Sequence, residues 1–208
     1  MKLPPQLVNS QDWTLVGPMG PMVPEVLLSH SVLGVDGGAR FCSHMDVWVG
    51  DGDSHLEQIN SDYKYQFSPF KSASDMALAL DLLSSKLPMN IHFWGFLGGR
   101  KDHELINLGE ACLFLEKNPS SKIYFYNENA KIIFSLSGSG SWKFNHQGTF
   151  SLVCLKKIKF KLAGLCDYQV EDETELSPLS SLGLSNVAHG DFFVTSNGPF
   201  IIIFPEIK

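Results

Sequence analysis

The sequence changes character near Asn127, and this change restricts the folds open to a chain of 208 residues. Before Asn127, short apolar segments rich in β-branched residues alternate with segments of helical periodicity. After Asn127 the helical periodicity ends, and short strand-like segments follow one another. Because each of these sequence patterns is typical of a different architecture, the sequence predicts an α/β region followed by an all-β region.

The first region, residues 1–128, is predicted to be a doubly wound, Rossmann-like α/β domain. Its predicted strands are Trp13–Val16, Val32–Val35, Val47–Val49, Ile91–Phe96 and Ile123–Tyr126. Its predicted helices run from Ser74 to Leu87, where Pro88 stops the helix, and from Asp102 to Glu116. Strands of this kind, apolar throughout and alternating with helices, are typical of a buried parallel sheet.

The second region, residues 129–208, is predicted to be an all-β domain of the sandwich or barrel type. Its strand candidates are Lys131–Leu136, Ser141–Asn145, Thr149–Leu155, Lys157–Leu162, Phe192–Thr195 and Phe200–Phe204. Glycine-containing turns at 137–140, 146–148 and 197–199 separate several of them. No Pro/Gly-rich spacer lies at the boundary, so we expect the two regions to pack closely.

Charge and cysteine content restrict the partners of the chain and the compartment in which it works. Sixteen basic and 22 acidic residues give a net charge of -6, so we expect no general binding to nucleic acid. No apolar run approaches the roughly 18 residues that a membrane span needs, so we expect no membrane insertion. The four cysteines form no CxxC pair and no signal peptide is recognisable, which favours a reduced, cytoplasmic protein.

Five aspartates lie where predicted strands end or predicted helices begin. Asp36 follows the second strand, Asp51 and Asp53 follow the third, and Asp75 and Asp102 lie in the first turns of the two helices. In an open α/β sheet, the carboxyl ends of the strands and the following helix starts share one edge, and ligands bind there. The sequence therefore predicts that these five carboxylates meet in one crevice.

A crevice of this kind favours magnesium-dependent phosphoryl chemistry. Clustered carboxylates repel one another unless a cation neutralises them, and oxygen ligands select Mg²⁺ rather than zinc. Lys71 and Arg100 add positive charge beside glycine-rich loops whose backbone can approach phosphate oxygens. Each motif alone is also an ordinary turn or helix-start signal. The sequence contains neither a P-loop nor a dinucleotide-binding fingerprint.

Four motifs, taken in order, resemble those of the thiamine pyrophosphokinase family. They are Asp36-Gly37-Gly38-Ala39, Gly50-Asp51-Gly52-Asp53-Ser54, Lys71 with Ser74-Asp75, and Gly98-Gly99-Arg100-Lys101-Asp102-His103 with Asn107. The second region is similar more loosely, through Gly164-Leu165 before Tyr168 and through Ser185-Asn186. The resemblance spans nearly the whole chain, and the combination of motifs is specific where no single motif would be.

This resemblance implies transfer of the diphosphate group of ATP to the hydroxyl of thiamine, with release of AMP. It also implies a homodimer in which the substrate lies between the α/β domain of one subunit and the β domain of its partner. Position by position, it implies a Mg²⁺ site made by Asp36, Asp51, Asp53 and Asp75. It implies that Lys71 and Arg100 stabilise the transferring group, that Asp102 and Asn107 organise that pocket, and that the nucleotide is bound by Gly37, Gly38 and Ser54. Ser185 and Asn186 would line the thiamine pocket.

Departures from the family pattern leave alternatives open. Ser72 stands where the family usually has aspartate, Ser74 where it has threonine, and Arg40 where asparagine is common. Together these changes leave open a diphosphokinase for another small alcohol, such as a pterin. The missing charge at Ser72 favours a thiamine- or nucleotide-binding sensor that has lost catalysis. A nucleic-acid-binding module is a more distant alternative, suggested by the lysines that alternate along 157–161.

Overall fold

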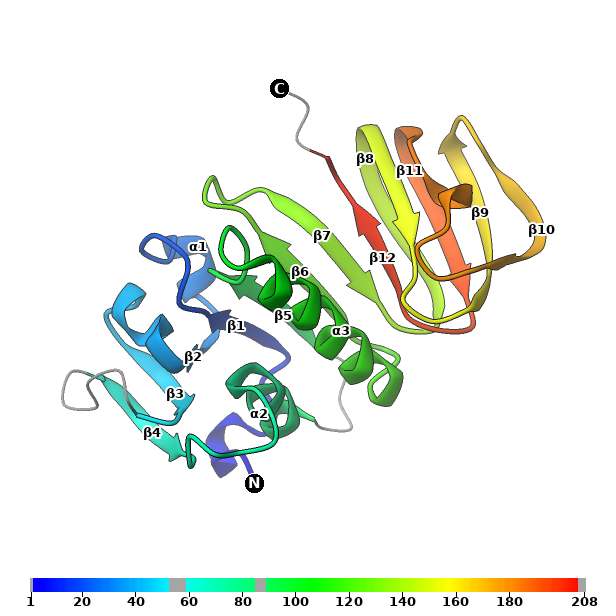
Figure 1. Ribbon diagram of the computed structural model, residues 1–208. Coiled ribbons are helices and arrows are strands. Elements are labelled where there is room, and N and C mark those ends of the chain that lie inside the picture. The colour runs from blue at the N-terminus through cyan, green and yellow to red at the C-terminus, as the bar shows by residue number, and fades with distance from the viewer. Residues whose placement is uncertain (1, 53–58, 85–88, 206–208) are drawn as a thin grey trace.

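The computed structural model describes residues 2–52, 59–84 and 89–205, whose strands form one twelve-stranded mixed sheet accompanied by few helices (Figure 1). Six strands are parallel: β1 (Asp12–Val16), β2 (Ser31–Val35), β3 (Met45–Gly50), β4 (Ser61–Gln66), β5 (Asn90–Trp94) and β6 (Lys122–Tyr126). The others pair antiparallel: β7 (Ile132–Ser137), β8 (Gly140–Val153), β9 (Ile158–Cys166), β10 (Val170–Leu176), β11 (Asn186–Ser196) and β12 (Phe200–Ile203).

The order of the strands places β1 at the centre of the parallel part. The full order is β10-β9-β11-β8-β12-β7-β6-β5-β1-β2-β3-β4, so the chain builds outward from β1 in one direction and then crosses over to β5. The carboxyl ends of β1, β2 and β5 therefore lie side by side where the direction of winding reverses. Ligands of open parallel sheets bind at this kind of position.

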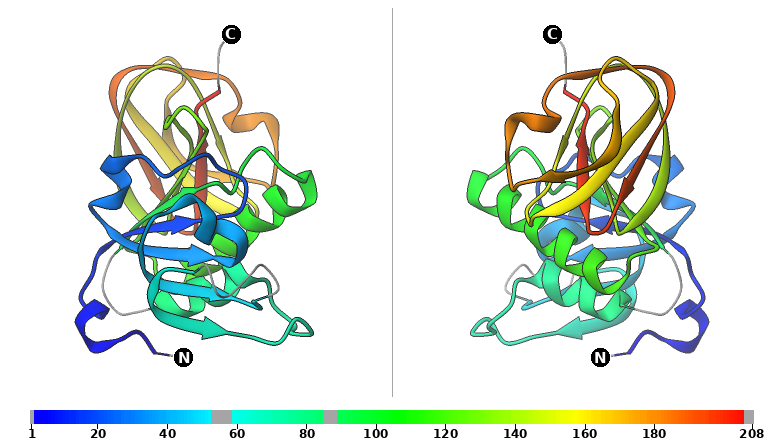
Figure 2. Two further views of the ribbon diagram at one scale, coloured as in Figure 1. Left: turned by 90° about the vertical axis from the view of Figure 1, so that its left-hand side faces the viewer. Right: turned by 90° about the vertical axis from the view of Figure 1, so that its right-hand side faces the viewer.

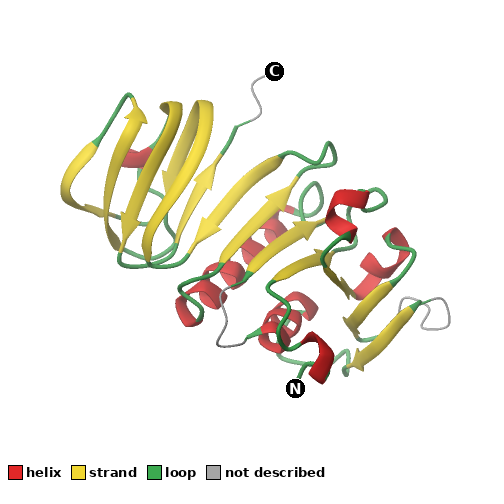
Figure 3. Cartoon of the chain, turned by 180° about the vertical axis from the view of Figure 1, so that it is seen from behind, coloured by secondary structure: helices red, strands yellow, loops and turns green. Residues whose placement is uncertain are grey.

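The two faces of the parallel part are covered differently. The long helices α2 (Asp75–Leu83) and α3 (Lys101–Lys117) pack on one face, and the apolar residues of alternate strand positions form the first core against them. The other face carries the short helix α1 (Glu25–Leu28) and the 3₁₀ helix η2 (Asp36–Phe41). Seen from behind, the middle of the sheet lies in front of the long helices (Figure 3). None of the described helices is long and apolar enough to cross a lipid bilayer.

Strands β8 to β12 enclose a second apolar core, and they curl away from the parallel part (Figure 2). The long strand β8 pairs with β11 over residues 140–150 and with β12 over residues 151–153. β12 contributes to both cores, since Ile201 packs in the first and Ile202 in the second. Among the described residues, the remaining helical segments, η1 (Pro5–Leu7) and η4 (Ser181–Gly183), are single 3₁₀ turns.

Most predicted strands coincide with observed ones, but three expectations need correction. The turn predicted at 146–148 is wrong, because β8 runs through it in unbroken register with β11 and Gly148 takes a φ of 120° inside the strand. The helix predicted to reach Leu87 ends at Leu83, where Ser84 leaves the helical conformation. The strands β4 and β10 were not predicted. The division of the chain between residues 128 and 129 stays a prediction.

A small polar network lies on the face of the sheet opposite the long helices. The rings of His30 and His92 stack with centroids 4.5 Å apart, and His92 Nδ1 lies 2.8 Å from the Tyr126 hydroxyl. The pKa of His92 is lowered from 6.5 to about 4, chiefly by burial and also by the nearby His30, while Asp12 acts in the opposite direction. His92 is therefore held neutral in the folded protein.

We expect the folded state to lose stability as the pH falls from 6.5 to 4. Over this range the unfolded chain protonates His92 and the folded chain does not, so lowering the pH favours unfolding, by on the order of 1–2 kcal/mol after allowance for partial exposure. His92→Gln should remove part of this dependence in urea unfolding measured at several pH values. The control is His103→Gln at an exposed histidine, and equal pH slopes for the two variants would contradict the assignment.

Candidate active site

A cavity of about 430 Å³ opens at the carboxyl edge of the parallel strands. It lies between the ends of β1, β2 and β5 and the beginnings of α2 and α3. Its wall is made by Pro18, Met19, Val35, Asp36, Pro69, Lys71, Ala73, Ser74, Asp75, Met76, Gly95, Phe96, Gly99, Arg100, His103, Glu104 and Asn107. The charged side chains belong to three separate loops, so the fold brings together residues that are far apart in the sequence.

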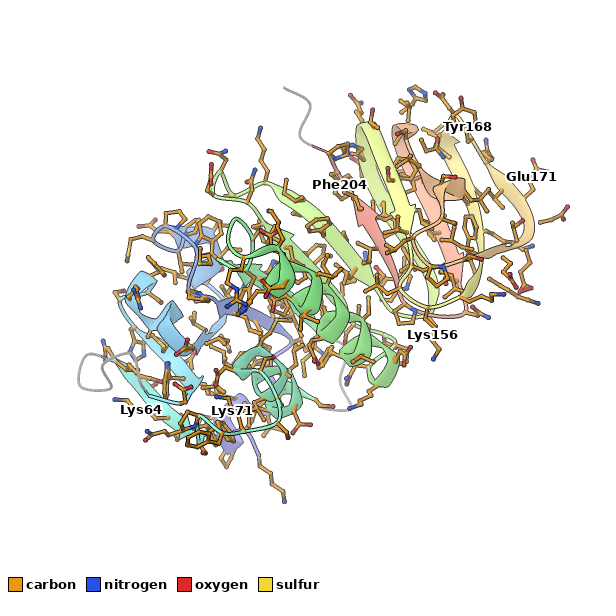
Figure 4. The ribbon with its side chains drawn as sticks, viewed as in Figure 1. Lys64, Lys71, Lys156, Tyr168, Glu171 and Phe204 are labelled. Atoms are coloured by element: carbon orange, nitrogen blue, oxygen red, sulfur yellow. The ribbon has the colours of Figure 1, made fainter. Side chains whose placement is uncertain are left out.

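Lys71 lies between two of the predicted carboxylates. Its Nζ atom is 3.1 Å from Asp75 Oδ1 and 3.4 Å from Asp51 Oδ2. The side chains of Lys71, Asp51 and Asp75 are only 15%, 17% and 18% exposed, so these ion pairs are largely shielded from water. Figure 4 shows Lys71 in the segment between β4 and α2, and Lys64 earlier in the chain, on β4. The ion pairs thus join the end of β3 to the start of α2 through one ammonium group.

The position of Asp75 follows from the way α2 begins. Ser74 is the N-cap, and its hydroxyl accepts a hydrogen bond of 3.1 Å from the Ala77 backbone N–H, which starts the helix at Asp75. Burial raises the pKa of Asp75, Lys71 opposes this, and the charges of Asp36 and Asp51 add to the increase. Burial alone would lower the pKa of Lys71, but its interactions with Asp75 and Asp51 raise it. Asp36, Asp51, Lys71 and Asp75 therefore form one electrostatic unit.

Asp36 is held by a turn that permits little change. It takes a left-handed φ of 47°, and its carbonyl oxygen accepts a hydrogen bond of 3.0 Å from Trp48 Nε1. Gly38 packs so closely on β1 that a Cβ atom there would lie 1.9 Å from the Val16 carbonyl oxygen. Gly37 is also buried, and its carbonyl oxygen accepts a hydrogen bond of 2.9 Å from Arg40 Nε. The two glycines thus have a structural role behind Asp36, while their predicted contact with a nucleotide stays a prediction.

The start of α3 forms the opposite rim of the cavity. Arg100 Nε donates to Asp102 Oδ1 over 3.1 Å, and the Arg100 side chain is largely exposed. This interaction lowers the pKa of Asp102 to about 2. Asp102 itself does not line the cavity, whereas Arg100 and Asn107 do. Asn107 is oriented by a weak hydrogen bond of 3.4 Å from its Nδ2 to the Phe96 carbonyl oxygen. We infer that Asp102 acts on the cavity through Arg100.

Ser185 and Asn186 lie apart from this cavity, at the start of β11. The Asn186 side chain is committed to the backbone of Tyr168: its Oδ1 accepts from the Tyr168 N–H over 3.0 Å, and its Nδ2 donates to the Tyr168 carbonyl over 2.7 Å. The Ser185 N–H donates to the Ser151 hydroxyl over 3.0 Å. These hydrogen bonds hold the start of β11 against the chain at Tyr168 and against Ser151 of β8. Asp53 and Ser54 lie outside the described residues.

The apolar half of the cavity was not predicted from the sequence. Pro18 and Met19 follow β1, and Phe96 follows β5, so they lie at the same edge as Asp36. The rule that selected the aspartates, residues just after a predicted strand, would also have selected Pro18 and Met19. They were passed over because they carry no charge, although they can contact the apolar part of a ligand.

The donor atoms of the cavity suit a hard cation. Asp36 and Asp75 line the cavity, and Asp51 does not line it but contacts Lys71. All three offer only carboxylate oxygens, which Mg²⁺ prefers, and their mutual repulsion is a reason to bind positive charge. In the described part of the chain, no three His, Cys, Asp or Glu side chains are already gathered closely enough to hold a metal ion. Lys71 occupies the space between two of the carboxylates. The chemistry of the ligands thus fits Mg²⁺, and their arrangement around it would require Lys71 to move.

The fold and the cavity place the chain among enzymes that bind a charged ligand at the carboxyl edge of a parallel sheet. Residues 25–125 match the family model described as thiamin pyrophosphokinase, catalytic domain. Residues 25–125 therefore form a thiamin pyrophosphokinase catalytic domain, and the protein is an enzyme of the thiamine diphosphokinase class. The resemblance seen in the four motifs is thereby confirmed. No curated protein matches the chain.

Solved structures share the fold over nearly the whole chain. Thiamine pyrophosphokinase from Bacillus subtilis matches with a TM-score of 0.72 and 21% identity, covering 95% of this chain and 100% of that one. Thiamin pyrophosphokinase from Candida albicans matches with a TM-score of 0.70 and 16% identity, covering 97% and 90%. The yeast enzyme matches with a TM-score of 0.66 and 12% identity, covering 98% and 91%. The likeness therefore includes the antiparallel strands that follow the matched catalytic domain.

Proposed function

We propose that this enzyme transfers the diphosphate group of ATP to the hydroxyl of thiamine in a Mg²⁺-dependent reaction that releases AMP. The observation that carries the proposal is the partly enclosed Lys71 between Asp51 and Asp75, in a cavity at the carboxyl edge of the sheet. An enclosed set of opposite charges of this kind suits a polyanionic substrate that arrives with its own cation. The match of residues 25–125 to the family model supports thiamine as the acceptor.

In this reaction the hydroxyl oxygen of thiamine forms a bond to the β-phosphorus of ATP, and the bond between that phosphorus and the α,β-bridging oxygen breaks. Lys71 and Arg100 stabilise negative charge on the transferring group and on the departing AMP. One carboxylate of this cluster would accept the hydroxyl proton as general base. Met19 and Phe96 give the cavity an apolar wall for a heterocyclic ring.

Asp36 and Asp51, with Asp75, are the described residues that would hold Mg²⁺. When bound, Mg²⁺ supplies charge neutralisation for the phosphate oxygens. Asp53 is assigned to the same ion only by the family motif. The four cysteines are all free and buried, which supports our inference that the enzyme works in the reducing cytoplasm.

A homodimer is part of the proposal, because two apolar surfaces of the chain are left exposed. The first consists of Met19 in the cavity wall and of Phe70, Leu105 and Ile106, which are neighbours in sequence of other wall residues. The second consists of residues at the end of β9 and in the loops that follow β9 and β10: Leu165, Tyr168, Leu179, Leu182 and Leu184. Contact between the first surface of one subunit and the second of its partner would bring Ser185 and Asn186 to the cavity from outside. A monomer in light scattering at assay concentrations would contradict this arrangement.

The test of function is the release of AMP from Mg²⁺-ATP, measured with and without thiamine, followed by identification of the product by mass. We expect AMP formation to require thiamine and to yield thiamine diphosphate. AMP formation with a pterin or another alcohol, but not with thiamine, would overturn the acceptor. Binding of ATP or thiamine without any AMP would instead favour the sensor alternative that Ser72 raised.

A further inference from the structure

Lys71 occupies a position that a divalent cation would need. Its ammonium group bridges Asp51 Oδ2 at 3.4 Å and Asp75 Oδ1 at 3.1 Å, so one positive charge serves two carboxylates. Asp75 Oδ1 is buried and makes no hydrogen bond of regular geometry within the described residues, so the Lys71 charge is what compensates it there. At 15% exposure, the Lys71 side chain is enclosed and differs from a mobile surface lysine.

We propose that Lys71 is the counter-ion of the carboxylate site before a cation binds, and that it must leave Asp51 and Asp75 for Mg²⁺ to enter. The inference rests on the proposed function for the identity of the ion. An ammonium group and a dication repel each other strongly at the separations that this pocket allows. Lysine suits an exchange of this kind, because its charge sits at the end of a flexible four-carbon stem and is not fixed by a planar, bidentate group.

This movement of Lys71 would couple the binding of the cation to the binding of the nucleotide. Mg²⁺ alone must displace Lys71 without offering it another anionic partner, so it binds weakly. A triphosphate that enters with the cation presents oxygens to which Lys71 can move, and the cost of breaking the two ion pairs is offset. The same lysine would therefore hold the carboxylates together before binding and contact the substrate afterwards.

Calorimetric titration with Mg²⁺, in the absence of nucleotide and thiamine, tests the proposal. We expect Lys71→Met to bind Mg²⁺ about tenfold more tightly than the unchanged protein, because the competing charge is gone. Lys71→Arg keeps the charge and should bind nearly as weakly as the unchanged protein. Lys64→Met, at an exposed lysine on β4, controls for the loss of one surface charge. Equal or weaker Mg²⁺ binding by Lys71→Met would overturn the proposal.

A second measurement uses the unchanged protein, in case Lys71→Met does not fold. An amine-reactive label is applied in EDTA and in saturating Mg²⁺, and the labelled lysines are identified by peptide mass. We expect labelling of Lys71 to rise several-fold with Mg²⁺ while labelling of Lys64 stays constant. Labelling of Lys71 that does not respond to Mg²⁺ would show that the ion pairs persist, and this result would overturn the proposal.

Both measurements are independent of turnover. If AMP formation fails but the two Mg²⁺ responses are seen, the exchange of Lys71 stands and the proposed reaction does not. If thiamine-dependent AMP forms but neither Mg²⁺ response is seen, the reaction stands and Lys71 does not compete with the cation.

Discussion

Asp75→Asn is expected to lower the rate of thiamine-dependent AMP formation by about a thousandfold or more while leaving the protein folded. The substitution keeps the shape of the side chain but removes a negative charge from the carboxylate cluster that is proposed to hold Mg²⁺. It also leaves Lys71 with one carboxylate partner where it had two. Because Asp75 precedes the interior of α2 and the Ser74 cap is untouched, the helix should form as before. Steady-state kinetics with Mg²⁺-ATP and thiamine measure the effect, and we expect a similar loss for Asp51→Asn.

The matched control is Asp81→Asn, which removes an exposed carboxylate from the same helix. Its turnover should stay within about twofold of the unchanged enzyme, since surface substitutions of this kind have small effects. Circular dichroism and melting of both variants separate loss of chemistry from loss of fold. A folded Asp75→Asn enzyme with near-normal turnover would remove the carboxylate cluster from the mechanism.

Gly38→Ala should have the largest effect on stability. The new Cβ would lie 1.9 Å from the Val16 carbonyl oxygen and 2.6 Å from the Val16 carbonyl carbon, both on the backbone at the end of the central strand β1. Neither group can move without separating β1 from the strands on either side, so we expect a loss of more than about 4 kcal/mol. Since many domains have only about 5–15 kcal/mol in total, the variant should be largely insoluble or unfolded. Urea unfolding and the soluble yield measure this.

Gly109→Ala provides the same chemical change with the opposite expected sign. Gly109 lies in the middle of α3, and a Cβ atom there would have no neighbour within 4 Å. Alanine in a helix interior is more stable than glycine by about 0.5–1 kcal/mol, so this variant should unfold at higher urea. If Gly38→Ala kept the stability of the unchanged protein to within about 1 kcal/mol, the close packing of the Asp36 turn on β1 would be disproved.

The strands that could be predicted from the sequence are those buried in the sheet, and the two that were missed are its edges. β4 and β10 are the outermost strands, and each carries charged or polar residues at its exposed positions. Edge strands need such residues to avoid pairing with other chains, so they lack the apolar run by which buried strands are recognised. In β4, Tyr63 and Tyr65 alternate with exposed residues, and this alternation is the sign of a strand that remains in the sequence.

The location of the candidate site could be predicted from the sequence, but the contacts among its residues could not. The rule that strand ends meet at one edge located Asp36, Asp51 and Asp75, and the structure joins them through Lys71. The bridging position of Lys71 depends on contacts between residues twenty positions apart, which spacing alone does not reveal. The hydrogen bonds of Asn186 to the Tyr168 backbone could not be predicted either, because the sequence gives the residue type but not the hydrogen-bond partners of its side chain.

The place of β12 in the sheet has a consequence for biosynthesis. It is the last strand in chain order, yet it lies between β7 and β8, and its Ile201 and Ile202 complete the two separate cores. The parallel part emerges from the ribosome first, but one side chain of its core arrives only with residue 201. Domains usually fold in order as they are synthesised. Here the first core lacks Ile201 until the β12 strand is translated, so the nascent chain exposes apolar surface that the finished sheet covers.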